Sequence, residues 1–426
     1  MSNGVPMADV NRPYTPGVLS LPVLVGALGF FVDIYDLLLF SIVRRASYLD
    51  LGVPEDALKT IGESTISWQM FGLTIGGIFW GILGDKKGRK QVLFGSILLY
   101  SLATLANGFV QTTDQYTLLR FVAGLGLAGE LGASITLTSE MLPREKRGIA
   151  AAIIATSGVG GTIFAYIVYR LSGEDWRLCY IIGGLMGLAL LFLRVRVLES
   201  GLFSQVRQTD VQRGNILMFF TNGERFLRYI RSIFIGLPVW YVIGILISFS
   251  DEFAKQFGIT GFDQPTALML QYVALAFGDM TAGFLSNYLK SRKKTLLIFY
   301  AILALFIGLF FVLRGGGSAF HMYLICLGLG FGSGMSVLYI TMSAEQFGTN
   351  LRATAAISIP NLVRGFLPLM LFLFQFLRSE AVFGEYVTAA WITGLVVMTL
   401  GFVSVLRTRE TFGRELDYLE GQGKAG

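Results

Sequence analysis

Twelve apolar stretches, each long enough to cross a lipid bilayer, constrain this chain more than any other feature of its sequence. A membrane-spanning helix needs about 20 predominantly apolar residues, and such stretches recur along all 426 residues. Only 15% of the residues are charged, whereas about 25% is usual in soluble domains. We therefore predict an all-α integral membrane protein with twelve transmembrane helices, near residues 18–43, 64–84, 91–111, 116–142, 148–171, 177–197, 229–250, 266–289, 295–313, 320–345, 353–377 and 385–406. The first stretch carries two aspartates and lacks a small-residue cleavage site, so we expect it to be retained and not cleaved as a signal peptide.

Positive charge is distributed unevenly between the predicted loops. With the N-terminus placed in the cytoplasm, 24 of the 34 lysines and arginines fall on the cytoplasmic side, eight fall outside, and two lie within predicted spans. Cytoplasmic loops of membrane proteins carry this excess. We therefore expect a multi-pass protein of the inner (plasma) membrane with both termini in the cytoplasm. Topology explains the net charge of +6, so nucleic acid is not expected as a partner.

The longest predicted cytoplasmic connection divides the spans into two sets of six. The segment Gly124-Leu-Gly-Leu-Ala-Gly129 returns in the second set as Gly328-Leu-Gly-Phe-Gly-Ser333. Parallel repeats of this kind predict two six-helix, pseudo-symmetric bundles. The predicted organisation is a cytoplasmic tail (1–17), an N-terminal bundle (18–197), a cytoplasmic linker (198–228), a C-terminal bundle (229–406) and a second cytoplasmic tail (407–426).

Several motifs resemble those of one transporter family. The loop Gly81-Ile-Leu-Gly-Asp-Lys-Lys-Gly-Arg-Lys90 matches the pattern G-x-x-x-D-R/K-x-G-R/K-R/K at every fixed position, and it resembles the signature loop of the major facilitator superfamily. Gly29-Phe-Phe-Val-Asp-Ile-Tyr-Asp-Leu37 resembles the first helix of phosphate:proton symporters, whereas Leu198-Glu-Ser-Gly201 and the tail Arg409–Glu420 resemble sugar porters. The resemblance implies a central cavity lined by helices 1 and 4 of one half and 7 and 10 of the other, with helices 2, 5, 8 and 11 contributing.

The chain departs from the phosphate symporters at two places. It has Ala128-Gly-Glu-Leu-Gly132 where they have GGDYP, and it has Gly244 four residues after Trp240, where they have an acid. These departures favour a small organic anion or an amino acid over inorganic phosphate.

Acidic residues inside the predicted spans are candidates for proton coupling. Burying an ionised side chain at the bilayer centre costs at least ~2.5–3.5 kcal/mol, so such residues need a function or a partner. Asp33 and Asp36 lie three residues apart on one face of the first span, and Glu130 lies near the middle of the fourth. Carboxylates in a low-dielectric cavity take up protons readily. We predict that these three acids carry the coupling protons; the alternative is that they anchor helices structurally.

Arg364, near the middle of the eleventh span, is a candidate for substrate binding. An arginine stays positively charged and grips a carboxylate or phosphate with two parallel hydrogen bonds. The segment Arg364-Gly-Phe-Leu-Pro368 resembles that of organic-anion transporters, which implies an anionic substrate; the alternative is an internal ion pair with one of the acids. Further candidates for the substrate site are Gln69, Tyr166, Trp240, Tyr241, Gln271, Tyr339 and Asn361.

Charged residues at the predicted cytoplasmic helix ends are candidates for gating. We expect them to form ion pairs when that end closes and to lose them when it opens; the alternative for the signature loop is a determinant of topology only. The gating candidates are Asp85, Arg89, Glu140, Arg147, Glu199, Glu345 and Arg352.

These features predict a proton-coupled secondary transporter of a small anionic or zwitterionic organic solute, a carboxylate or an amino-acid-like compound. We expect alternating access around a midplane site, a monomer in the lipid bilayer, and the solute and protons as its only other partners. A sugar or polyol porter and an exporter of amphiphilic compounds are the alternatives. One histidine and two cysteines leave no constellation for an intramembrane enzyme, a metal site or a bound cofactor. A solute sensor would need a soluble output domain, and no segment beyond the spans is long enough.

Overall fold

The computed structural model describes residues 20–87, 89–141, 144–199 and 216–413. Side chains are described for most of these residues, with the stretches 84–91, 130–152 and 195–199 among the exceptions. Every regular element within the described ranges is a helix, as expected in lipid, where a helix satisfies its backbone hydrogen bonds within one segment. The predicted all-α membrane fold is therefore confirmed.

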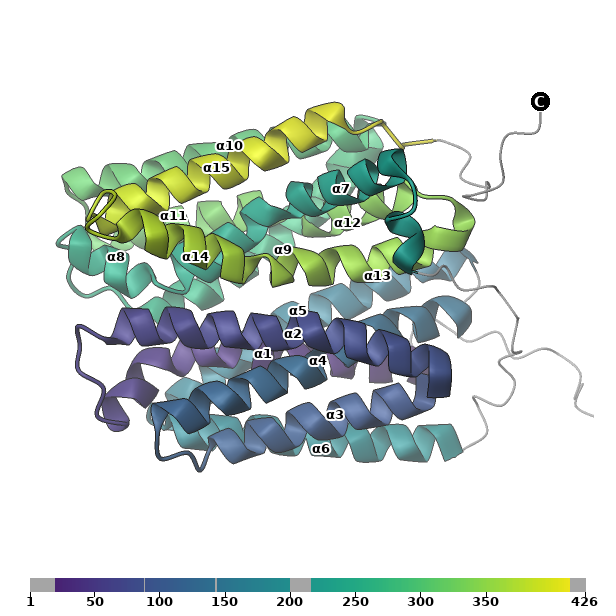
Figure 1. Ribbon diagram of the computed structural model, residues 1–426, viewed down its shortest axis with the longest axis horizontal. Coiled ribbons are helices and arrows are strands. Elements are labelled where there is room, and N and C mark those ends of the chain that lie inside the picture. Colours follow the sequence, from purple (N-terminus) through teal and green to yellow (C-terminus); the bar gives the residue numbers. More distant parts are fainter. Residues whose placement is uncertain (1–19, 88, 142–143, 200–215, 414–426) are drawn as a thin grey trace, which may run out of the picture.

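Six helices form the first half of the molecule. Figure 1 shows them lying side by side on one side of the structure. They are α1 (Leu21–Asp50), α2 (Leu58–Lys87), α3 (Arg89–Asn107), α4 (Thr113–Met141), α5 (Arg144–Leu171) and α6 (Trp176–Glu199).

The second half has more elements because three of its predicted spans are interrupted. A π-helix continues α7, and two further spans are divided into consecutive helices. The elements are η1 (Ile216–Phe219), α7 (Gly223–Tyr241), the π-helix η2 (Val242–Ile247), α8 (Ser250–Gln256), α9 (Gln264–Tyr288), α10 (Arg292–Val312), η3 (Leu313–Gly315), α11 (Ala319–Ser333), α12 (Ser336–Glu345), α13 (Thr349–Gly365), α14 (Leu367–Arg378) and α15 (Tyr386–Arg407).

The interruptions have local causes. Pro368 lacks the N–H that would continue the hydrogen-bond ladder from α13 into α14, and the two helices are separated at Phe366. Between α11 and α12, Gly334 lies against α9 so closely that a Cβ there would be 2.4 Å from Cα of Gly278. The main chain thus bends at this glycine where the two backbones meet.

Eight segments of the described part are long and apolar enough to cross a membrane. Three of these segments include one of the interruptions. The count of twelve spans stays a prediction. The eight segments are Val23–Asp50, Trp176–Arg194, Gly223–Ile247, Gln264–Tyr288, Arg292–Gly315, Ala319–Glu345, Thr354–Arg378 and Tyr386–Arg407.

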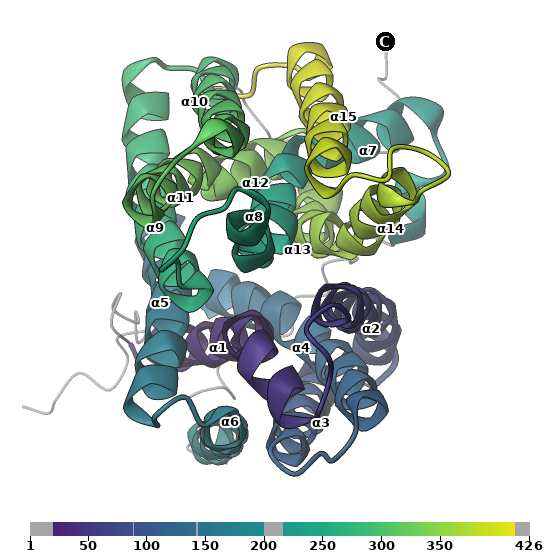
Figure 2. The ribbon, with the colours of Figure 1, turned by 90° about the vertical axis from the view of Figure 1, so that its left-hand side faces the viewer.

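The two groups of helices face each other along their length. Viewed end-on, α3 and α6 lie on the far side of the first group, and α10 and α15 on the far side of the second (Figure 2). Contacts between the groups are made by α1, α2, α4 and α5 with α9, α13 and α14. The helices that meet at this interface are those that can position a site between the halves.

Within each half, glycines let two helices touch backbone to backbone. A Cβ at Gly124 of α4 would lie 2.1 Å from the carbonyl oxygen of Gln69 in α2. The second half repeats this arrangement: a Cβ at Gly330 of α11 would lie 2.2 Å from the carbonyl oxygen of Gln271 in α9. Small residues permit such close crossings in membrane proteins, and here they fix the helices that border the interface.

Candidate functional site

Arg364 lies in the last turn of α13, directly before the interruption at Phe366. Its guanidinium carbon is 5.4 Å from the centre of the Trp240 ring. The charge also interacts electrostatically with Asp33 of α1 and with the hydroxyl-bearing rings of Tyr272 and Tyr339. The guanidinium makes no hydrogen bond or ion pair to any residue that the structure describes. A half-buried, permanently charged group of this kind is suited to bind an anion.

Two side-chain amides of the candidate site have buried polar atoms without a hydrogen-bond partner in the described part of the chain. Asn361 precedes Arg364 by about one helical turn, and its buried Oδ1 accepts no hydrogen bond from the described residues. Gln271, the neighbour of Tyr272 in α9, is fully buried, and neither its Oε1 nor its Nε2 has a hydrogen-bond partner in the described part. Buried polar atoms are normally paired with protein or water. These amides are therefore available to a polar ligand or to water.

The aromatic and charged side chains of this site come from irregular segments. Trp240 precedes the π-helix η2, in which a Cβ at Gly244 would lie only 2.5 Å from Cδ2 of Leu367. Tyr339 lies in α12, whose first turn is capped by Asp279 of α9: Oδ1 accepts a hydrogen bond from the Val337 N–H at 3.0 Å. Interrupted helices and π-bulges recur at binding sites in membrane proteins. Three of them converge here around Arg364.

A second charged group lies inside the first half. Nη1 of Arg120 in α4 donates to Oδ1 of Asp36 in α1 at 3.2 Å, and both side chains are inaccessible to solvent. Thr104 donates to the same oxygen at 2.7 Å, and the ring of Tyr180 lies 4.6 Å from the guanidinium carbon. The second carboxylate oxygen, Oδ2, is buried without a hydrogen-bond partner in the described part. This oxygen is a site where a proton can be added without breaking an existing hydrogen bond.

The two aspartates of α1 therefore have different surroundings, although three residues separate them. Asp36 faces Arg120 within the first half, whereas Asp33, 7% exposed, interacts with Arg364 of the second half. The third predicted proton carrier, Glu130, belongs to α4, but its side chain lies outside the described residues.

The remaining predicted substrate residues have partners of their own. The Gln69 amide donates to the Leu37 carbonyl at 3.3 Å. Tyr166 of α5 contacts Thr266 of α9 at 3.1 Å, across the interface between the halves. Tyr241 is buried and donates to the Ala390 carbonyl at 2.7 Å. The structure does not place Tyr241 with Arg364, because its hydroxyl points toward α15.

The predicted gating residues are described only in the second half. The side chains of Asp85, Arg89, Glu140, Arg147 and Glu199 lie outside the described residues. Glu345 is 3.5 Å from Nη2 of Arg292 and accepts a hydrogen bond from Thr411 at 2.6 Å. Nε of Arg352 donates to the Phe347 carbonyl at 3.4 Å. These contacts join the end of α12 to α10 and to the segment after α15.

Sequence reasoning missed three ion pairs that join the two halves at the end of the molecule opposite the end of α15 (Figure 1). Their residues lie at the ends of the predicted spans or just outside them, where charge is inexpensive, so the cost of insertion did not single them out. The pairs are Arg44–Asp251 at 2.5 Å, Arg378–Glu63 at 2.6 Å, and Arg170–Asp263.

Comparison with known proteins places this geometry in a family. The family model described as the Major Facilitator Superfamily matches residues 26–367. A putative metabolite transport protein of Haemophilus influenzae is 28% identical over 362 residues, covering 81% of this chain and 86% of that protein. A gentisate transporter of Corynebacterium glutamicum is 27% identical over 347 residues, 78% of this chain and 75% of that protein. The crystal structure of a D-xylose–proton symporter, 17% identical, superimposes with a TM-score of 0.68 over 92% of this chain and 99% of that chain.

Proposed function

Because the chain belongs to the major facilitator superfamily, we propose that it is a proton-coupled secondary transporter of a small organic anion or zwitterion. Membership makes it an integral membrane transporter and not an enzyme. The single observation that carries the substrate class is the guanidinium of Arg364, half-buried at the interface and without a hydrogen-bonding partner among the described residues.

The surroundings of Arg364 fit a carboxylate attached to a planar or apolar body. The guanidinium can donate two parallel hydrogen bonds to a carboxylate, while the rings of Trp240, Tyr272 and Tyr339 offer flat apolar surface beside it. Gentisate, the compound named for the relative in Corynebacterium glutamicum, is a small aromatic carboxylate. A zwitterion would place its ammonium group toward Asp33.

Coupling follows from competition for Arg364. Asp33 of α1 lies within electrostatic reach of Arg364, and a nearby positive charge favours the ionised form of a carboxyl group. A substrate carboxylate that binds Arg364 neutralises this charge, so Asp33 then takes up a proton more readily. Substrate and proton thus favour each other, as symport requires. Asp36 with its unpaired Oδ2, and Glu130 from the sequence pattern, are the further proton carriers of the proposal.

Alternating access would occur by rocking of the two groups of helices about the central site. The three ion pairs between the halves hold one end of the molecule closed. The excess of lysine and arginine assigns the other end, where α15 ends, to the cytoplasm, so the ion-paired end faces outward. We propose a monomer in the inner membrane with both termini on the cytoplasmic side.

A neutral polyol is the second candidate substrate. Sugars are bound mainly by neutral amides and hydroxyls, and the unpaired amide groups of Gln271 and Asn361 would serve this purpose. A fixed positive charge has no partner on such a substrate, which is why the organic anion is preferred.

A thermal-shift screen of the detergent-purified protein tests the substrate class. The compounds are benzoate, gentisate, acetate, proline, xylose and inorganic phosphate, each at several concentrations. A ligand that binds only the folded state raises the melting temperature with its concentration. We expect stabilisation by carboxylates and not by xylose; stabilisation by xylose alone would replace the anion by the polyol.

Variants of Arg364 identify the group responsible. Arg364→Ala should abolish the ligand-dependent shift, and Arg364→Lys should reduce it because a lysine cannot form the two parallel hydrogen bonds. Arg314→Ala is the matched control, since Arg314 is an exposed arginine paired with Glu385 near the outer end. Undiminished carboxylate binding by folded Arg364→Ala protein would contradict the assignment.

A further inference from the structure

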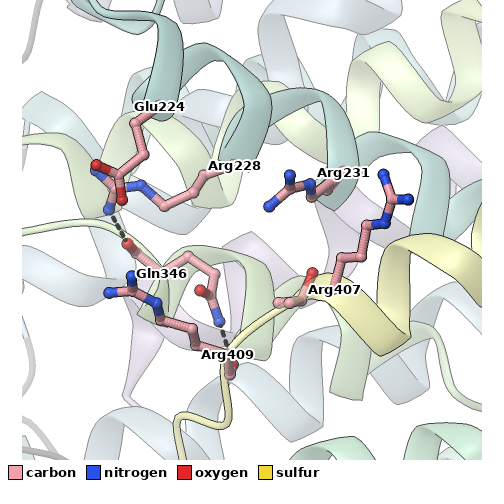
Figure 3. Close-up of a pocket in the computed structure, with 7 residues that line it drawn as sticks. Glu224, Arg228, Arg231, Gln346, Arg407 and Arg409 are labelled. Carbon is pink, nitrogen blue, oxygen red and sulfur yellow. Dashed lines mark hydrogen bonds between the residues drawn. The ribbon is translucent and has the colours of Figure 1, made fainter.

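We propose that the second half binds the phosphate group of an anionic membrane lipid in an arginine-lined cavity at the end of the molecule where α15 ends. The cavity has a volume of about 280 Å³ and is lined by Arg228, Arg231, Arg407 and Arg409, together with Glu224 and Gln346. Figure 3 shows the arginine side chains entering this space from two sides. The carboxylates, aromatic rings and amides of the transport site contribute nothing to it.

The arginines come from segments that are distant in the sequence and are held together by hydrogen bonds. Arg228 and Arg231 lie on α7, whereas Arg407 ends α15 and Arg409 follows it. Gln346, between α12 and α13, links the two sides. Its backbone carbonyl accepts a hydrogen bond from Nη1 of Arg228 at 2.7 Å, and its side-chain Nε2 donates to the backbone carbonyl of Arg409 at 2.8 Å (Figure 3). The two segments that carry the arginines are therefore linked to each other through Gln346.

A second set of contacts fixes the segment that carries Arg407 and Arg409. Nζ of Lys293 in α10 donates to the carbonyls of Leu406 and Thr408, at 2.6 and 3.2 Å. Glu410 accepts hydrogen bonds from the N–H groups of Arg292 and Lys293, at 3.0 and 3.1 Å. The backbone on both sides of the two arginines is thus anchored to α10.

The charge of the cavity is unbalanced. Among the residues that the structure describes, four arginines and one acid, Glu224, line the cavity. The guanidinium groups of Arg231, Arg407 and Arg409 make no hydrogen bond or ion pair to the part of the chain that the structure describes. Like charges that line one cavity repel one another, and a bound anion relieves the repulsion. Phosphate suits several arginine forks at once, because it has more than two oxygens that accept paired hydrogen bonds.

The border of the cavity favours a lipid over a soluble phosphate. Leu227 and Leu406 adjoin Arg228 and Arg407 in the sequence, Val403 precedes Arg407 by about one helical turn, and the three are 50, 47 and 38% exposed in that order. In a bilayer such apolar side chains contact acyl chains. Given the orientation proposed above, the cavity opens at the cytoplasmic leaflet, which carries anionic lipids, and basic pockets between helices on this side bind their headgroups.

Lipid titration of the purified full-length protein, followed by native mass spectrometry, tests this site. Phosphatidylglycerol is the anionic probe, and phosphatidylcholine is the zwitterionic comparison. Each arginine near an anionic surface contributes about fivefold in affinity. We expect Arg231→Gln/Arg407→Gln to lower the affinity for phosphatidylglycerol by roughly 25-fold and to leave phosphatidylcholine binding unchanged. Arg409→Gln alone should lower it about fivefold, which provides a milder variant if the double one unfolds.

A charge-matched control separates the cavity from the general positive charge of this end. Lys290 and Lys294 are exposed at the same end of the same half and do not line the cavity. Lys290→Gln/Lys294→Gln should keep the parent affinity for phosphatidylglycerol. If both double variants lose the same affinity for phosphatidylglycerol, the proposed site is wrong. Equal affinity of the parent protein for the two lipids would also contradict it.

Inorganic phosphate distinguishes the source of the ligand. At millimolar concentration it should not displace phosphatidylglycerol, because it lacks the acyl chains that cover the apolar border. Efficient displacement would assign the cavity to a soluble phosphate compound and overturn the lipid. None of these outcomes depends on Arg364, so failure of the transport proposal leaves this test unaffected.

Discussion

Asp36 and Arg120 form a buried ion pair at 3.2 Å, although 84 residues separate them in the sequence. The pair joins α1 to α4, with Thr104 and Tyr180 completing its surroundings. Two buried charges in contact can be replaced together at modest cost, but removing one partner leaves the other charge without compensation. The effect of a substitution at Asp36 or Arg120 on stability therefore depends on whether the other residue is also replaced.

We predict that Arg120→Gln destabilises the protein more than the double change Asp36→Asn/Arg120→Gln. Breaking a buried pair costs about 3–5 kcal/mol because an unpaired charge stays inside, and replacing both partners with amides removes that charge. Thermal unfolding of the two variants and of the parent in the same detergent measures the difference. A double variant as unstable as Arg120→Gln would show that the charge of Asp36 is not the cause.

Asp33→Asn should uncouple transport from the proton gradient. In proteoliposomes loaded with substrate, Asp33→Asn should retain exchange but lose accumulation driven by an inward proton gradient. The reason is that Asp33 interacts with Arg364 at the interface between the halves, where substrate binding can change its protonation. Asp50→Asn is the control, because Asp50 lies at the end of α1 and pairs with Arg177. Gradient-insensitive transport by the parent would make the protein a facilitator.

Gly124→Ala and Gly330→Ala should both destabilise the protein. The added methyl group would lie 2.1 and 2.2 Å from backbone carbonyl oxygens of Gln69 and Gln271, so neighbouring helices must separate. Overpacking of this kind typically costs about 1–3 kcal/mol. Gly308→Ala in α10 is the control, since nothing lies within 4 Å of a Cβ there. A melting temperature of Gly124→Ala equal to that of Gly308→Ala would contradict close packing of α2 and α4.

The membrane fold could be predicted from the sequence because its signals are local. Apolar length identifies a span without knowledge of its neighbours, and the cost of burying charge singled out Asp36 and Arg364 in the same way. The interruptions at Phe366 and Gly334 could not be predicted so directly. Gly334 bends where Gly278 of another helix approaches, and this approach is a property of packing.

The ion-pair partners of the charged residues could not be predicted from the sequence either. Arg120 and Glu130 are ten residues apart in the sequence, which is about 15 Å along a straight helix, and nothing in this spacing indicates Asp36 of α1 as the partner of Arg120. Glu63 and Arg378 were harder still, because each borders an apolar stretch and resembles an ordinary loop charge. Their contact, across 315 residues, arises only when the two halves meet.

Glu410 should stabilise the protein in a pH-dependent manner. Burial raises the pKa of its carboxyl group, whereas hydrogen bonds from Ser291 and from the N–H groups of Phe412, Lys293 and Arg292 lower it. Together the hydrogen bonds outweigh burial, so the pKa lies below its ordinary value. A carboxyl group with a lower pKa in the folded state stabilises above its unfolded pKa of about 4.3, and this contribution is lost as the pH falls through the folded value.

We therefore expect Glu410→Gln to lower stability at pH 7 by about 0.5–2 kcal/mol, as for a lost helix cap. The deficit should shrink below about pH 4, where the parent carboxylate is protonated too. Melting temperatures between pH 3 and pH 8 measure this convergence. Glu380→Gln is the control, because Glu380 is exposed; a deficit that persists unchanged at pH 3 would argue against the charge of Glu410.

Glu63→Gln should open the end of the molecule at which the three ion pairs lie. Glu63 of α2 is fully buried and accepts hydrogen bonds from both Nη atoms of Arg378 at 2.6 and 2.9 Å, and from Gln375 at 3.0 Å. All three contacts cross between the halves. Removing one partner of a buried pair costs about 3 kcal/mol or more, which is enough to shift an equilibrium between two conformations that differ by a few kcal/mol.

Cysteine labelling reports this opening. Ser248, 2% exposed, lies 3.1 Å from Ser41 of the other half, so Ser248→Cys in a background lacking Cys179 and Cys326 should be labelled slowly. Adding Glu63→Gln should raise its labelling rate roughly 100-fold, because ~1.4 kcal/mol corresponds to a factor of ten and the lost pair is worth about 3 kcal/mol. Asp50→Asn should leave the rate unchanged, because the Asp50–Arg177 pair lies within the first half. If Glu63→Gln and Asp50→Asn label alike, the ion pair does not hold the halves together, and closure at this end must come from the apolar contacts of α2 with α14.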